Sequence, residues 1–143
     1  MEFKIKMSPE EISKRIAHAM DLPFHHFLGL TIVKSDPGLA EIELCPTPKT
    51  INAGNVVHGG IIYSVLDIAA YLAMLPLLGP NQNGVTHDIH VSVLRAAPID
   101  KSLLFCARVQ KIGKRIVFCD SDAWCEDQLI AKGQITKSII EFS

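Results

Sequence analysis

One carboxylate, Asp67, lies in the middle of an apolar run that extends from Ile61 to Leu78. A carboxylate buried among apolar residues needs hydrogen bonds or a cation, because an uncompensated charge is costly to remove from water. A neighbouring Tyr or Ser, or a Lys or Arg from a strand, would supply such a partner. The alternative is that Asp67 does chemistry, as a general base or as a nucleophile.

If the run is helical, its few polar residues share one stripe with Asp67, because residues three and four apart face the same direction. This stripe carries Gly60, Tyr63, Ser64, Asp67, Tyr71 and Met74. We therefore expect Gly60, Tyr63, Ser64 and Tyr71 to contact a substrate that binds beside Asp67.

The sequence His58-Gly59-Gly60 comes directly before this helix. The first turn of a helix leaves backbone amides unpaired at the positive end of the helix dipole. Such amides can stabilise an oxyanion. The other interpretation is that the two glycines only allow tight helix packing.

Taken together, Asn52, His58, Gly59, Gly60 and Asp67 form the pattern N-x5-HGG-x6-D. This pattern resembles the signature of hotdog-fold acyl-CoA thioesterases of the phenylacetate-degradation (PaaI-like) branch. The resemblance extends over roughly residues 25–140, where "GVTHDIHVSVLRAA" and "LIAKGQITK" resemble two of the family's strands. One departure is "LRAAP" in place of the family's common "LRP", which affects a strand end.

The resemblance implies a role for each matching residue. Asp67 corresponds to the catalytic carboxylate, Gly59 to the residue whose amide polarises the thioester carbonyl, and His58 to the adjacent histidine. Asn52 corresponds to the asparagine that helps to place the reacting water or carbonyl, and Thr86 to the Ser/Thr that supports the carboxylate. Asp67 either activates water or attacks directly to form a mixed anhydride, and the sequence leaves both open. No cofactor is expected, since coenzyme A is part of the substrate.

Gly59 and Asp67 are eight residues apart, which on one helix separates them by about 12 Å along its axis. Both must reach one thioester group, so a single helix cannot supply both. We therefore expect a site shared between two antiparallel helices of a symmetric dimer. This agrees with the interfacial sites and frequent tetramers of the family, and it predicts a dimer or a dimer of dimers.

The remaining elements are predicted from capping and periodicity. A capping box at Ser8 and Glu11 precedes a helix over residues 9–20, which a linker over residues 21–30 follows. Strand-like segments are expected at residues 31–36, 39–46, 84–98, 101–113, 114–127 and 128–142. The short connections predict antiparallel neighbours. The order of elements indicates an α+β domain in which a curved sheet of about five to six strands wraps the long helix, with a short N-terminal helix.

Composition excludes several classes of protein. The 143 residues suit one domain, residues 1–143, of which residues 1–24 form the N-terminal helix and linker. A net charge of -1 and the lack of a basic run argue against nucleic acid as a partner. The central Asp67 and the lack of basic flanks argue against a membrane span. Four cysteines without C-x-x-C spacing argue against a metal site, and the absence of a secretion signal predicts a cytoplasmic location.

Two other functions stay open. A hotdog hydratase or dehydratase would need a differently placed His and acid pair, and a non-catalytic acyl-CoA-binding module would not need Asp67 and Asn52. The sequence does not select among aryl, medium-chain and long-chain acyl groups.

Overall fold

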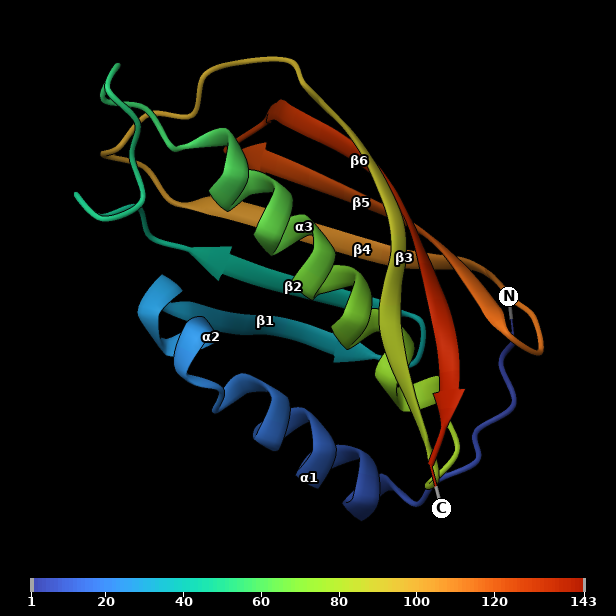
Figure 1. Cartoon of the computed structure of the whole chain (residues 1–143). Coiled ribbons are helices and arrows are strands. Elements are labelled where there is room, and N and C mark those ends of the chain that lie inside the picture. The colour runs from blue at the N-terminus through green and yellow to red at the C-terminus, as the bar shows by residue number, and fades with distance from the viewer. Residues whose placement is uncertain (1, 143) are drawn as a thin grey trace.

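The long central helix and the sheet around it dominate the computed structural model, which describes residues 2–142. In chain order the elements are α1 (Pro9–Met20), α2 (Pro23–Leu28), β1 (Leu30–Asp36), β2 (Leu39–Leu44), α3 (Gly59–Met74), the 3-10 helix η1 (Leu75–Leu77), β3 (Gln82–Val93), β4 (Leu103–Ile112), β5 (Ile116–Cys125) and β6 (Gln128–Glu141). The six strands form one antiparallel sheet in the order β1-β2-β4-β5-β6-β3. Figure 1 shows this sheet curved around α3, with α1 and α2 alongside β1. The expected α+β fold is confirmed.

The apolar residues of α3 explain why the sheet must wrap it. Most of the helix is buried, and Val65, Leu66, Ala69 and Ala73 have no exposed surface. The segment Gly59–Leu77 is long and apolar enough to cross a bilayer by length and composition, but 67% of its most apolar stretch is buried inside the protein. This degree of burial is typical of a core helix, and it agrees with the prediction that a curved sheet wraps the helix.

The N-terminal helix matches its predicted bounds. The Ser8 hydroxyl accepts a hydrogen bond from the backbone N–H of Glu11, at 3.1 Å, and so caps α1. The prediction that residues 21–30 form a linker was wrong in part, because residues 23–28 form the short helix α2. Pro23 starts α2, and Gly29 ends it in the left-handed conformation, with φ of 69°.

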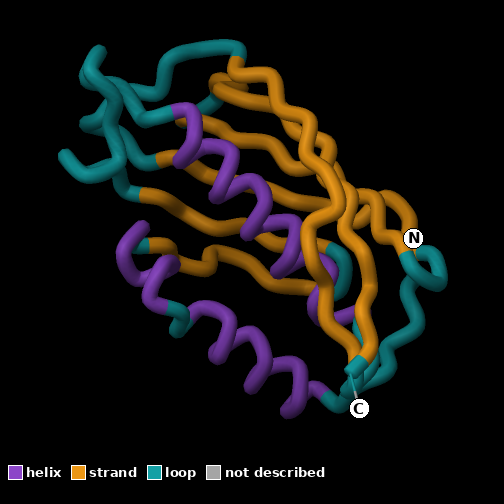
Figure 2. Tube along the Cα trace, viewed as in Figure 1, coloured by secondary structure: helices purple, strands orange, loops and turns teal. Residues whose placement is uncertain are grey.

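The loops gather at the end of the molecule where α3 begins (Figure 2). The segment before α3 is tied to the loop after β3, since the N–H of Val57 donates to the carbonyl of Ala97 at 2.9 Å. The N–H of His58 donates to the carbonyl of Thr50 at 2.8 Å. These bonds fix the position from which α3 starts.

Candidate active site

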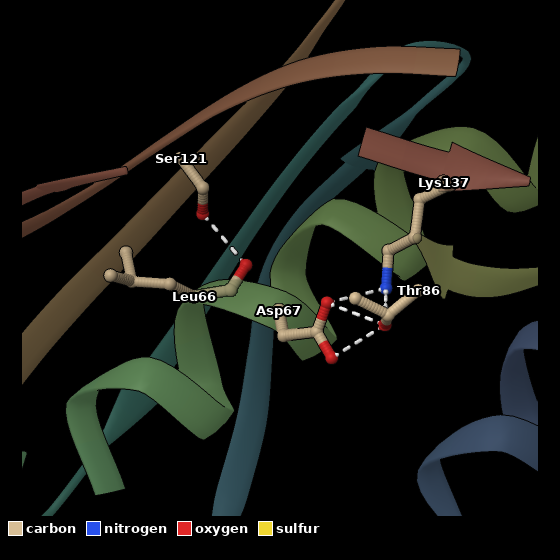
Figure 3. A network of polar contacts seen from close by, with 5 residues as sticks. All are labelled: Leu66, Asp67, Thr86, Ser121 and Lys137. Atoms are coloured by element: carbon tan, nitrogen blue, oxygen red, sulfur yellow. Dashed lines mark hydrogen bonds and ion pairs between the residues drawn. The ribbon is translucent and has the colours of Figure 1, made fainter. Parts of the chain in front are cut away.

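Asp67 lies in a closed triangle of polar contacts (Figure 3). The ammonium of Lys137 donates to Asp67 Oδ1 at 2.6 Å and to Thr86 Oγ1 at 3.0 Å. The Thr86 hydroxyl lies 2.9 Å from both carboxylate oxygens, to which it donates. Thr86 therefore stands where the resemblance implied, against the carboxylate, and Lys137 is an additional member of the site.

Strand pairing brings Thr86 and Lys137 together. The two residues are direct partners across the β3–β6 pair, so their side chains lie next to each other on one face of the sheet. Immediately afterwards the register shifts between Thr86 and Asp88, which leaves His87 as a bulged residue. Such a bulge changes which residues of the strand face inward. It lets Thr86 face α3 while Val91, further along β3, also packs against the core.

Lys137 is the residue that the sequence interpretation missed. Its side chain is 3% exposed, whereas that of Asp67 is 29% exposed. The ammonium also lies 5.9 Å from the centre of the Tyr71 ring, a distance at which a cation is attracted to the ring face. A signal was present, because Lys137 alternates in phase with the buried residues Gly133 and Ile135 of β6.

The backbone of α3 is fixed to the sheet next to Asp67. The buried Ser121 hydroxyl on β5 donates to the carbonyl of Leu66 at 2.9 Å (Figure 3). Gly133 on β6 permits this close approach, since a Cβ there would lie 3.0 Å from the Ser121 carbonyl oxygen and 3.5 Å from Leu66 Cδ1. The carboxylate is therefore presented from a helix that is held in place.

A cavity of about 660 Å³ opens beside Asp67. Residues of α1, α3 and β3 line it, among them Arg15, Tyr71, Val85 and Thr86, together with Leu22 between α1 and α2. The Tyr71 hydroxyl donates to Asn83 Oδ1 at 2.7 Å. Burial raises the pKa of Tyr71 above its usual value, so the phenol stays protonated and keeps this bond at neutral pH. The cavity therefore combines apolar walls with a few fixed polar groups.

The start of α3 has the features of an anion site. His58 caps the helix, and its Nδ1 accepts a hydrogen bond from the N–H of Gly60 at 2.9 Å. Within residues 2–142, the N–H of Gly59 has no hydrogen-bond partner. A Cβ on Gly59 would meet no atom within 4 Å. Tight packing within the chain therefore does not explain this glycine, and its backbone amide is not used within the described residues.

Asn52 lies near Gly59, at the end of the molecule where α3 begins. The two residues and Tyr63 line a second cavity, of about 410 Å³. Asn52 Oδ1 accepts a hydrogen bond from the N–H of Gly54 at 2.8 Å, which stabilises the turn before α3. Within residues 2–142, its Nδ2 has no hydrogen-bond partner.

The predicted site residues therefore form two groups. Asp67, Tyr71 and Thr86 line the first cavity, and Asn52, Gly59 and Tyr63 line the second. Two predicted substrate contacts lie between the groups, and their polar atoms are used within the helix. The Ser64 hydroxyl donates to the carbonyl of Gly60 at 2.8 Å, and the Gly60 amide is taken by His58.

Within the described residues, no group of three or more His, Cys, Asp or Glu side chains is placed to hold a metal ion. The four cysteines are free thiols.

The family model, the related sequences and the solved structures that resemble this chain agree with one another. A family model described as "Thioesterase superfamily" matches residues 54–132. Acyl-coenzyme A thioesterase 13 of Homo sapiens is 27% identical over 135 residues, which cover 92% of this chain and 94% of that protein. A solved structure of a conserved protein from Pseudomonas aeruginosa is 29% identical, with a TM-score of 0.81 over 86% of this chain and 98% of the other. The E. coli PaaI protein of the phenylacetic acid degradation operon shares the fold, with a TM-score of 0.82 and 22% identity over 95% of this chain and 99% of the other.

Proposed function

The chain belongs to the thioesterase superfamily, whose model matches residues 54–132, and from this premise we propose that it hydrolyses acyl-CoA thioesters to a free acid and coenzyme A. The observation that carries the proposal is one helix with a free amide at its start and a carboxylate further along. In the proposed reaction water is the second substrate, and no cofactor takes part. A cytoplasmic location stays a prediction from the sequence.

In the proposed reaction the thioester oxygen accepts a hydrogen bond from the Gly59 N–H. The dipole of α3 adds to this stabilisation as negative charge develops on the oxygen. Asp67 either takes a proton from the attacking water or attacks the carbonyl carbon itself. In both routes the carbon–sulfur bond breaks, and coenzyme A leaves as a thiol after taking up the proton that Asp67 removed from water or, in the second route, a proton from solvent. In the second route water then cleaves the mixed anhydride, which releases the free acid and restores the Asp67 carboxylate.

The spacing of these two groups supports a site shared by two chains. Gly59 and Asp67 lie on the same continuous helix and are separated by about 12 Å along its axis. In the proposed dimer, two α3 helices run antiparallel across a two-fold axis, so Gly59 of one chain faces Asp67 of the other. A symmetric dimer then has two equivalent sites.

The sheet offers a surface for this association. β3 is an edge strand, and it exposes the apolar side chains of Val85, Ile89 and Val93 by 45%, 37% and 43%. Unpaired edge strands with apolar side chains tend to pair with another chain. Tyr63 of α3, 40% exposed, lies in the cavity that Val93 also lines. Pairing of two β3 strands would cover these residues.

The test removes the Gly59 amide without removing the helix. Proline is well tolerated at the first position of a helix, and it has no N–H. The backbone of His58, with φ of -61° and ψ of 134°, suits a residue that precedes proline. We expect Gly59→Pro to fold normally and to lower kcat by about 100- to 1000-fold, the usual loss for one oxyanion donor. Gly59→Ala keeps the amide and is the matched control.

The assay is release of free thiol from acetyl, hexanoyl, lauroyl, palmitoyl and phenylacetyl thioesters of coenzyme A. Activity of the wild type on one class, retained in Gly59→Ala and lost in Gly59→Pro, would support the proposal and identify the substrate. Equal activity of Gly59→Pro and wild type would reject the role of the amide. A wild-type protein that forms dimers but releases no thiol would reject the proposed function.

A further inference from the structure

The two oxygens of the Asp67 carboxylate are not equivalent. Oδ1 lies 2.6 Å from the Lys137 ammonium and 2.9 Å from the Thr86 hydroxyl. Within the described part of the chain, the only hydrogen bond to Oδ2 comes from the Thr86 hydroxyl, also at 2.9 Å. One hydroxyl has a single proton, which the two oxygens must share. Figure 3 shows the less engaged oxygen on the side of the carboxylate away from Lys137.

The ammonium of Lys137 is itself held from several directions. Two of its three donors point at Asp67 Oδ1 and Thr86 Oγ1, and the ring of Tyr71 lies 5.9 Å away. Its backbone is paired on both sides, with Thr86 of β3 and Val117 of β5. A side chain that is 3% exposed in the middle of a paired strand has little freedom to move. The Lys137 ammonium is therefore held in one position, and it can orient the Asp67 carboxylate through its hydrogen bond to Oδ1.

From this geometry we infer that Lys137 is a positioning residue, which holds Oδ1 so that Oδ2 is the reacting oxygen of Asp67. The inference rests on the proposed thioesterase function, and it holds for both routes. Oδ2 either accepts the proton of water or forms the bond to the acyl carbon.

The charge of Lys137 also suits the course of the reaction. Before reaction, its ammonium balances the Asp67 carboxylate. When Oδ2 takes up a proton or an acyl group, Asp67 becomes neutral and negative charge appears on the substrate oxygen. The ammonium remains beside the site, where a fixed charge in a poorly hydrated environment is effective. Positioning and charge balance both require the ammonium, not only the aliphatic stem.

The experiment separates the charge of Lys137 from its packing. Lys137→Met keeps a stem of similar length and removes the charge. We expect it to remain folded and to lower kcat by about 100-fold, the scale of a misplaced catalytic group, with KM changed by less than about 3-fold, since ground-state binding is retained. Lys137→Ala should regain activity with added n-propylammonium, which replaces the missing atoms. The uncharged 1-propanol is the matched control.

Each outcome has a distinct meaning. A Lys137→Met protein with unchanged kcat, beside an active wild type, would overturn the inference and leave the proposed function intact. Recovery of Lys137→Ala by 1-propanol as well as by the amine, or by neither compound, would also overturn it, because the charge would not be what matters. A wild type that is inactive on every thioester would reject the proposed function, and the inference with it.

Discussion

In the Asp67–Lys137 pair, one carboxylate has a structural role as an ion-pair partner and, in the proposed reaction, a catalytic role. The two partners depend on each other unequally, since the Lys137 side chain is 3% exposed and that of Asp67 is 29% exposed. Without Lys137, the carboxylate can still be hydrated from the cavity. Without Asp67, a buried ammonium loses its ion-pair partner. Substitution of Asp67 therefore changes stability as well as chemistry.

This asymmetry predicts that Asp67→Asn unfolds more easily than the wild type. Removal of one partner from a buried ion pair costs about 3 to 5 kcal/mol, and the partial exposure of Asp67 places the expected loss at the lower end of this range. The double substitution Asp67→Asn/Lys137→Met removes the stranded charge and should recover most of that loss. Urea unfolding of the wild type, the single variants and the double variant measures the coupling. An Asp67→Asn protein as stable as the wild type would contradict this account.

At the residue scale the sequence singled out the carboxylate of Asp67 but not the ammonium of Lys137 beside it. The spacing of His58, Gly59 and Asp67 was visible in the chain, and so was Thr86 through the family resemblance. A Lys or Arg from a strand was one expected partner of Asp67. Lys137 itself could not be selected, because its contact with Asp67 depends on β6 lying next to β3 and on the inward direction of one β6 position. Strand order is not encoded in local periodicity.

At the scale of elements, α1 closes one wall of the cavity beside Asp67 and is attached through Arg15. The guanidinium donates to the carbonyls of Gly79 and Gln82, at 3.2 and 2.7 Å. These two residues form the turn between η1 and β3, in which the N–H of Gly79 also donates to Gln82 Oε1 at 2.8 Å. Arg15 thus connects α1 to the beginning of the strand that carries Thr86.

Arg15→Ala is therefore expected to loosen α1 and to raise KM more than it lowers kcat. Hydrogen bonds to a charged group contribute about 1.5 to 3 kcal/mol each, and the carbonyl of the buried Gly79 would keep only its hydrogen bond from the N–H of Gln82, at 3.1 Å. Lys14→Ala is the control for the attachment of α1, because Lys14 lines the same cavity but is 78% exposed and lies 3.7 Å from Glu10, an arrangement expected to contribute less than about 1 kcal/mol. Hydrogen exchange of the α1 amides, with steady-state kinetics, checks the prediction. Equal protection of α1 in both variants would show that Arg15 does not anchor it.

Long elements were predictable from the sequence, whereas short and irregular ones were not. The capping box at Ser8 located α1, and the apolar run located α3, because both patterns extend over several turns. Helix α2 has six residues, too few for a periodic pattern to emerge, so its segment was interpreted as a linker. The bulge at His87 has no local sequence signature, although without it Thr86 and Val91 would point to opposite faces of β3.

At the scale of the whole molecule, the two cavities of one chain contain complementary halves of the proposed site. The half with Asp67 has a carboxylate and an ammonium, and the half with Gly59 has a free amide at a helix start. The rigid helix between them keeps the halves apart. The sequence alone led to this conclusion, because the rise per residue of a helix is fixed. The edge position of β3, which supports the association, needed the sheet order that only the structure supplies.

A shared site predicts that two inactive variants restore each other. Gly59→Pro lacks the amide, and Asp67→Asn/Lys137→Met lacks the carboxylate without leaving the ammonium unpaired. Each variant alone should therefore release thiol at no more than about a hundredth of the wild-type rate. Unfolding and refolding them together in equal amounts makes about half of the dimers mixed, and symmetry gives each mixed dimer one complete site of two. The expected activity is roughly a quarter of that of refolded wild type. Mixing the folded variants for a short time is the control, since activity should appear only as chains exchange. A mixture that forms mixed dimers, as shown by mass spectrometry, yet stays inactive would place Gly59 and Asp67 in separate functions.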